Sequence, residues 1–169
     1  MIKKNKNGFT LVELLVVIAV IALIGVFAAV AVNSARSKQR DATRLANVRQ
    51  LQSALEDFFN ESNVYPEGEL TPLGDSSVSA CLGLDGFASN CSSDSSVFMR
   101  IVPTTFDKGL DSIVTCGDPA RNAFCFTQLE EGDSYVIHFE LENGLASVGL
   151  QAGVNCATPD GMEAGICDD

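Results

Sequence analysis

The sequence predicts an α+β fold: a long N-terminal helix packed on a small antiparallel sheet with disulfide-pinned loops. Three observations carry this prediction. Residues 14–32 are an uncharged apolar run of nineteen residues, apolar side chains recur at helical spacing over 42–58, and residues 81–169 hold short β-rich runs and all six cysteines. We divide the chain into four segments: a leader (1–8), an apolar helix (9–35), its amphipathic continuation (36–62) and a globular head (63–169).

The first segment, "MIKKNKNG", is short and basic and ends in Gly8. An ordinary secretory signal places a small-residue cleavage site after its apolar core. No convincing A-x-A site followed by a loop occurs after residue 32. The order is therefore reversed, with a short leader first and an apolar segment that is retained.

The apolar run is long enough to be a candidate membrane span, at the short end of the range. It carries one carboxylate, Glu13, near its start. A charged group in mid-membrane costs about 2.5–3.5 kcal/mol or more, so an ionisable residue there is a functional hypothesis that requires a partner. The alternative is that Glu13 only reaches back to the lipid headgroups.

The helix is expected to continue beyond the apolar run as an amphipathic segment. No proline occurs before Pro66, and "NESNVYP" supplies turn formers that end the helix near Asn60. From Phe9 to Asn60 an unbroken helix would be about 75 Å long at 1.5 Å per residue. Its apolar stripe consists of Ala42, Leu45, Val48, Leu51, Leu55 and Phe58.

Charge is distributed unevenly. The formal net charge is −11, and loss of the leader with its three lysines leaves 8 basic and 22 acidic residues, or −14. Five basic residues and one acid lie between Arg36 and Arg49, whereas three basic residues and twenty acids follow Gln50. The acidic head argues against nucleic-acid binding. This basic segment, residues 36–49, is called the basic collar. It either meets anionic lipid headgroups or is a solvated helix face.

The head is predicted to contain strands at 97–102, 123–129 and 134–141, where β-branched and aromatic residues gather. "ENG" (142–144) is a hairpin turn signal before a further run at 145–150. We expect this sheet to pack on the helical stripe. The segments 74–96 and 155–169 are rich in turn formers and are predicted to be loops.

The six cysteines predict disulfides, because an even number occurs in a domain that is expected to be exported. Fifteen connectivities are possible, and the spacings favour three local pairs: Cys81–Cys91, Cys116–Cys125 and Cys156–Cys167. No C-x-x-C occurs and the single histidine, His138, lies in an expected strand, so neither zinc nor an acid–base role is predicted.

Enzymatic motifs are absent from the sequence: no G-x-S-x-G, P-loop or H-E-x-x-H occurs. We therefore predict no enzyme, no catalytic residue and no cofactor. Calcium remains the alternative, because it prefers oxygen ligands, although the spacing of the acids in the tail matches no EF-hand. These acids are Asp160, Glu163, Asp168 and Asp169.

The stretch "GFTLVELLVVIAVIALIG" resembles the class III signal of type IV pilins and of type II secretion pseudopilins. The resemblance is close over residues 3–32, and the helix that ends in Tyr65-Pro66 also looks like theirs. It implies cleavage between Gly8 and Phe9 by a membrane-embedded prepilin peptidase, and N-methylation of Phe9. An assembly ATPase and a platform protein would then extract the subunit from the membrane into a helical filament, where Glu13 meets the Phe9 amine of a neighbour.

The resemblance predicts a structural subunit of a type IV pilus-like filament. It would be anchored once in the cytoplasmic membrane with its head outside, and would later reach the cell surface as a homo-oligomer. One alternative is a pseudopilin of a secretion or DNA-uptake system, against which the lack of tryptophan weighs. Many relatives also carry a proline where this chain has Val30. An alternative of another class is a membrane-anchored binding module or enzyme.

Overall fold

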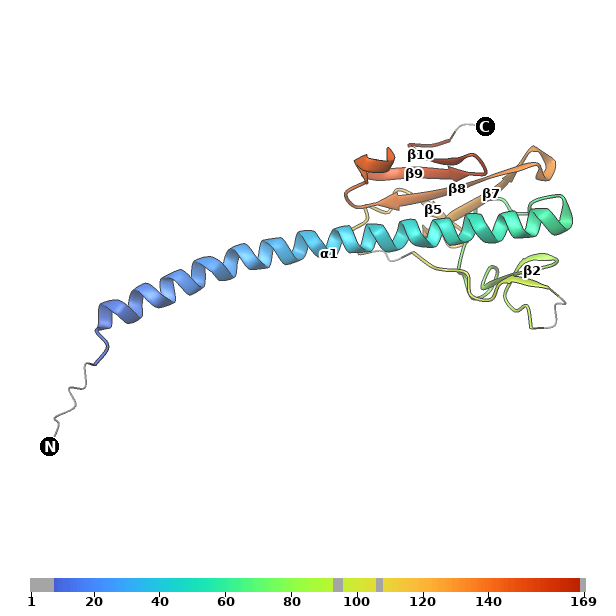
Figure 1. Ribbon diagram of the computed structural model, residues 1–169. Coiled ribbons are helices and arrows are strands. Elements are labelled where there is room, and N and C mark those ends of the chain that lie inside the picture. Colours follow the sequence, from blue (N-terminus) through green and yellow to red (C-terminus); the bar gives the residue numbers. More distant parts are fainter. Residues whose placement is uncertain (1–7, 93–95, 106–107, 168–169) are drawn as a thin grey trace. The chain divides into compact units, whose positions relative to one another are not determined.

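The computed structural model describes residues 8–92, 96–105 and 108–167. It contains one long helix, α1 (Leu11–Ser62), and three antiparallel sheets, which confirms the predicted α+β class (Figure 1). By internal contacts the chain forms two compact units, Met1–Arg36 and Ser37–Asp169. The apolar part of α1 belongs to the first unit, and the remainder of α1 belongs to the second together with every strand.

In the first unit, every described residue from Gly8 to Arg36 is exposed. Large apolar side chains follow one another along the helix, and no described residue of this unit covers them. By length and composition, α1 is a helix that could cross a membrane. An apolar surface of this extent marks contact with lipid or protein.

In the second unit, the amphipathic part of α1 packs on the largest sheet (Figure 1). The expected stripe forms the helical side of the core, with Leu45, Val48, Leu51, Leu55 and Phe58 all buried. The prediction was wrong at Ala42, which is exposed. The helix contributes three further buried residues: Asp41, Arg44 and Ala54.

The main sheet has the strand order β1-β7-β8-β9-β10 and is antiparallel throughout. Alternate residues of the central strand β8 point into the core, because successive side chains of a strand lie on opposite faces; these are Tyr135, Ile137, Phe139 and Leu141. The strands are β1 (Thr71–Pro72), β7 (Cys125–Leu129), β8 (Ser134–Leu141), β9 (Gly153–Thr158) and β10 (Gly161–Ala164).

Two smaller sheets complete the head. The first has the order β3-β2-β4 and comprises β2 (Cys81–Gly83), β3 (Gly86–Ala88) and β4 (Val97–Met99). The second pairs β5 (Thr115–Cys116) with β6 (Arg121–Asn122). Two 3-10 turns, η1 (Glu130–Gly132) and η2 (Ala146–Val148), lie beside β8 in the sequence.

Three assignments from the sequence were wrong. The expected loop at 74–96 contains the β2–β3 hairpin, and the expected loop at 155–169 contains most of β9 and all of β10. The expected strand at 145–150 is instead the turn η2, which is closed by an isolated bridge between Leu145 and Leu150. The next strand along the chain, β9, pairs with β8 and begins only at Gly153.

The structure joins all six cysteines in the local pairs that the spacing favoured. The Cα–Cα distances are 6.1 Å for Cys81–Cys91, 5.8 Å for Cys116–Cys125 and 5.8 Å for Cys156–Cys167. These distances lie in the range of unstrained bridges. Each bridge closes a loop with few buried apolar anchors, which explains why a small acidic head needs them.

Candidate functional site

The predicted cleavage site lies immediately before α1. Gly8 and Phe9 are both exposed, and Phe9 is 83% accessible. A Cβ placed on Gly8 would have no described atom within 4 Å, apart from those of its chain neighbours. An accessible peptide segment directly before a helix is a suitable protease substrate.

Thr10 and Glu13 cap the start of the helix reciprocally. The Glu13 backbone N–H donates to Thr10 Oγ1 at 3.2 Å, and Glu13 Oε2 accepts from the Thr10 backbone N–H at 2.8 Å. The Thr10 hydroxyl also donates to the same carboxylate oxygen, at 2.8 Å. This is a capping box, which satisfies two backbone N–H groups that a helix start leaves without partners.

The capping box gives Glu13 a role that our sequence interpretation missed. Its signal, T-x-x-E before an apolar run, was visible in "TLVE". The carboxylate therefore has partners within its own chain at the start of the apolar helix. Oε1 makes none of the hydrogen bonds of the box, so a further donor could approach there.

A second charged cluster joins α1 to the turn after β8. Arg44 is completely buried and contacts Asp41 at 2.9 Å and Glu142 at 2.8 Å. Arg40 makes a bidentate contact with Glu142: its Nε donates to Oε1 and its Nη2 donates to Oε2, each at 2.5 Å. Hydrogen bonds from Arg40 and Arg44 hold the pKa of Glu142 below its usual value, against the opposing effect of burial.

The remaining oxygens of this cluster are also used. The Asp41 carboxylate accepts from the backbone N–H groups of Glu142 and Asn143, each at 2.8 Å, and from the Asn143 side chain at 3.0 Å. Arg44 Nη2 donates to the Lys108 carbonyl at 2.9 Å. Arg44, one of the basic residues of the collar, is therefore buried in the head. It neither meets lipid headgroups nor belongs to a solvated helix face, the two alternatives that the sequence left open.

A third carboxylate, Glu140, orders a neighbouring loop. It is 4% exposed and accepts from the backbone N–H groups of Asp111 and Ile113, at 2.6 and 3.0 Å, and from the Asn122 side chain at 2.9 Å. These three hydrogen bonds tie residues 111–113 and Asn122 to β8. Glu140 and the Arg44 cluster are structural sites, because their partners are groups of the same chain.

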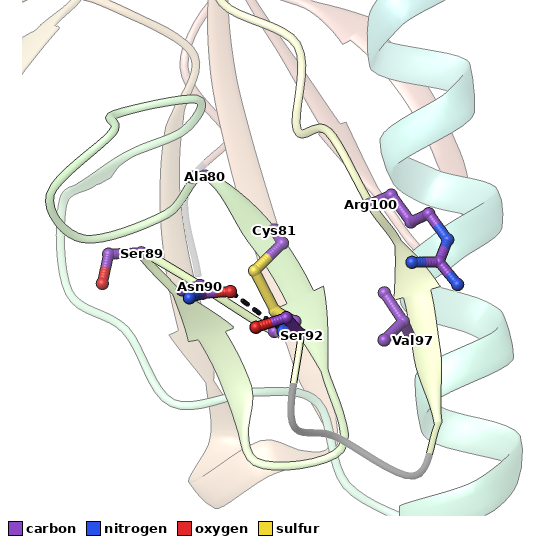
Figure 2. Close-up of a pocket in the computed structure, with 8 residues that line it drawn as sticks. Ala80, Cys81, Ser89, Asn90, Ser92, Val97 and Arg100 are labelled. Atoms are coloured by element: carbon purple, nitrogen blue, oxygen red, sulfur yellow. Dashed lines mark hydrogen bonds between the residues drawn. A yellow bond between two sulfur atoms is a disulfide. The ribbon is translucent and has the colours of Figure 1, made fainter.

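The described part of the head contains a small pocket of about 190 Å³ beside a disulfide (Figure 2). Figure 2 shows Val97 and Arg100 on one side and the Cys81–Cys91 bridge on the other, with Asn90 accepting from the Ser92 backbone N–H at 2.9 Å. The described lining residues include one cation and no carboxylate or histidine. They therefore offer no acid–base pair for catalysis.

The residues weighed for metal binding are dispersed. Asp160 and Glu163 are exposed near and in β10, whereas Asp168 and Asp169 lie outside the described residues. No group of three His, Cys, Asp or Glu side chains suited to a metal occurs among residues 8–92, 96–105 and 108–167. His138 is half-buried in β8, paired with Cys125 on one side and Cys156 on the other.

Residues 3–29 match the family model described as the prokaryotic N-terminal methylation motif. The chain carries a class III signal. This signal is that of type IV pilins and pseudopilins. The class III signal includes Gly8, Phe9, Thr10 and Glu13. No curated protein and no solved structure gives a significant match to the chain.

Proposed function

We propose that this protein is a structural subunit of a type IV pilus-like extracellular filament. The observation that carries the proposal is the class III signal, which leads into a single helix from Leu11 to Ser62. The apolar half of that helix is exposed at every described residue of its own unit, from Gly8 to Arg36. Burying this surface requires either lipid or other apolar helices. The membrane supplies lipid before assembly, and the filament supplies the helices of other subunits afterwards.

In this proposal, prepilin peptidase cuts between Gly8 and Phe9 and methylates the new amine. An N-methylated amine remains cationic at neutral pH, so the modification preserves a positive charge at Phe9. Glu13 lies four residues further on and meets that amine on a neighbouring copy. Attraction between two charges is stronger in an apolar bundle than in water, and pairing also fixes the register between copies.

Mass spectrometry of the mature N-terminus tests the processing step. We expect a chain that begins with N-methylated Phe9, and the unprocessed chain in cells that lack the prepilin peptidase. A mature chain that starts at Met1, or beyond residue 25, contradicts the proposal. An ordinary membrane-anchored enzyme or binding module would keep its leader in both strains.

Electron microscopy of sheared surface material tests the filament itself. We expect long filaments that antibodies against the head label along their whole length. A pseudopilin of a secretion or DNA-uptake system would be processed in the same way, but would give no long surface filaments at its normal level. In that case deletion of the gene would abolish secretion or DNA uptake, which identifies the second role.

A further inference from the structure

An asparagine–glycine pair, Asn143-Gly144, lies in the turn after β8. The sequence holds one other such pair, Asn7-Gly8, in the leader. Asparagine is a thermally labile residue, most of all before glycine, because glycine carries no side chain that would keep its backbone nitrogen away from the neighbouring carboxamide. Asn143 is also exposed, so water reaches it. The turn therefore contains a candidate site of spontaneous modification.

The modification is deamidation. The backbone nitrogen of Gly144 loses its proton and attacks Cγ of Asn143. A bond forms between these two atoms, the bond from Cγ to Nδ2 breaks, and ammonia leaves with the proton, so that a cyclic succinimide remains. Water then adds to one of the two ring carbonyl carbons and opens the ring, which leaves aspartate or isoaspartate at position 143. The net reaction consumes one water and releases one ammonia.

Asp41 opposes the first step, because it holds the carboxamide in place. Its Oδ2 accepts from Asn143 Nδ2 at 3.0 Å and from the Asn143 backbone N–H at 2.8 Å. Asp41 is only 1% exposed, so little water competes for these contacts. The carboxamide must leave this oxygen before Gly144 can attack it. The nearby carboxylate also disfavours loss of the Gly144 proton, because like charges repel each other.

The backbone of the turn is fixed as well. Gly144 has φ +68°, and its Cβ position lies 2.5 Å from the Gln151 carbonyl carbon and 2.6 Å from the Ala152 nitrogen. Leu145 and Leu150 close the turn with reciprocal backbone hydrogen bonds of 2.9 and 3.1 Å. The Gly144 nitrogen therefore approaches Cγ of Asn143 only when this turn opens.

We propose that Asn143 is a deamidation site that the folded head keeps unreacted, and that its reaction loosens the attachment of α1 to the turn after β8. Aspartate places a second carboxylate where Nδ2 donates to Asp41, so repulsion replaces a hydrogen bond. Isoaspartate also lengthens the backbone, which displaces the N–H groups of Glu142 and Asn143 from Asp41. This inference concerns the head alone and does not rest on the proposed function.

Chemical denaturation tests the protection. The full-length protein is incubated at mildly alkaline pH, either folded in detergent micelles or unfolded in guanidinium chloride. Peptide mapping by mass spectrometry follows the conversion of amide to acid. We expect Asn143 to react at least about tenfold faster in the unfolded chain, because one hydrogen bond to a charged group contributes about that factor. Equal rates in the two states would overturn the protection.

Asn63 is the internal control for the role of glycine. It is exposed like Asn143 but precedes Val64, whose branched side chain crowds the attacking nitrogen. We expect Asn63 to react slowly in both states. Reaction of Asn63 at the rate of Asn143 in the unfolded chain would overturn the assignment of Asn143 as a special site.

Substitution of Asp41 tests which group protects the turn. Asp41→Asn removes the charge and converts one carboxylate oxygen into a donor. We expect it to deamidate at Asn143 at least about tenfold faster than the wild type. Asp57→Asn makes the same change at an exposed residue of α1 and should leave the rate unchanged. Rates are compared below the denaturation midpoints and corrected for the unfolded fraction. A wild-type rate in Asp41→Asn would overturn the role of Asp41.

Variants at position 143 test the consequence for α1. Asn143→Asp carries the product carboxylate, whereas Asn143→Ala removes the Nδ2 hydrogen bond without adding charge. We expect Asn143→Asp to raise the equilibrium constant for unfolding about tenfold more than Asn143→Ala, and to accelerate amide hydrogen exchange at residues 40–45. Wild-type protein aged until Asn143 has reacted should show the same faster exchange. Equal stability of the two variants, or unchanged exchange in the aged protein, would overturn the effect on α1.

Discussion

Glu13 shows how one carboxylate can serve two environments. Within its own chain it closes a capping box with Thr10, so its Oε2 already has two donors. A donor from a neighbouring subunit would therefore be an additional partner of the carboxylate, which already accepts hydrogen bonds from Thr10. This arrangement lowers the cost of keeping a carboxylate in the apolar segment before any neighbour arrives.

Substitutions at Glu13 can separate capping from charge. Glutamine is also accepted in a capping box, so Glu13→Gln should keep the helix start but lose the charge, whereas Glu13→Ala loses both. We expect both variants to be cleaved and inserted normally and to assemble poorly, because breaking one side of a buried ion pair costs about 3–5 kcal/mol. The measurement is filament yield relative to processed subunit in the membrane. Normal assembly of Glu13→Gln would show that the charge is not needed.

Thr10 provides the complementary test. Replacing a capping Thr with Ala typically costs about 0.5–2 kcal/mol. We therefore expect Thr10→Ala to accelerate amide hydrogen exchange in the first turn of α1 in detergent micelles, while Thr10→Ser leaves exchange unchanged. Unchanged exchange in Thr10→Ala would remove the capping role.

Arg44 is the buried residue that sequence periodicity was least able to find. A stripe of apolar positions predicts the core face of a helix, but an arginine at such a position is counted as surface. Its partners include Glu142, nearly a hundred residues away, so no local pattern contains the cluster. The only local sign was Asp41, which lies three residues before Arg44.

Replacing Arg44 with methionine should destabilise the head by about 3–5 kcal/mol, because Asp41 and Glu142 then keep buried charges without their shared cation. Chemical denaturation of the processed protein, followed by fluorescence of its tyrosines, measures the loss. Arg49→Met on the exposed face of the same helix is the control and should change stability by no more than about 0.5 kcal/mol. Similar losses in both variants would contradict the buried role of Arg44.

Glu142 should make the stability of the head depend on acidity. Its pKa in the folded state lies below its ordinary value because Arg40 and Arg44 donate to it. Its contribution is therefore fully present above the ordinary pKa, about 4.5, and is lost as the pH falls through the folded value. Between pH 6 and about pH 3 we expect the free energy of unfolding to fall less in Glu142→Gln than in the wild type. Equal slopes would contradict this account.

At the scale of elements, the sequence pattern predicted the longer strands correctly but did not predict the short hairpins. β7 and β8 contain several β-branched and aromatic residues, and both were predicted. The β2–β3 and β9–β10 hairpins are punctuated by glycine, cysteine and aspartate, which also form loops. Their turn signals, "DG" at 85–86 and "PDG" at 159–161, were present in the sequence. The strand residues on either side of these turns were too few to show the alternation of apolar and polar side chains that identifies a strand.

The turn after β8 depends on one glycine. Gly144 has φ +68°, and a Cβ there would lie 2.5 Å from the Gln151 carbonyl carbon. Gly149 has a similar φ, +77°, but nothing lies within 4 Å of its Cβ position. We expect Gly149→Ala to cost about 1–2 kcal/mol from backbone strain, and Gly144→Ala to cost more because the backbone must also move. Thermal unfolding of both variants measures the difference, and equal costs would contradict the steric argument.

For the molecule as a whole, the disulfides supplement a small core. Each bridge closes a loop of 9 to 11 residues, which corresponds to about 2–3 kcal/mol through the entropy of the unfolded chain. A Cys81→Ser/Cys91→Ser variant should therefore unfold at lower denaturant concentration, by an equivalent free energy. Non-reducing peptide mapping of the wild type should recover the three local pairs, and long-range pairs would contradict this connectivity.

The order of the bridges has a consequence for biogenesis. Each cysteine is bonded to the one that precedes or follows it in the sequence: first to second, third to fourth, fifth to sixth. A head that emerges from a translocation channel in the order of its sequence would expose its thiols in that same order. Pairing each new thiol with the one just before it then gives the native set directly. An oxidant alone is sufficient for such a chain, and a disulfide isomerase is not required.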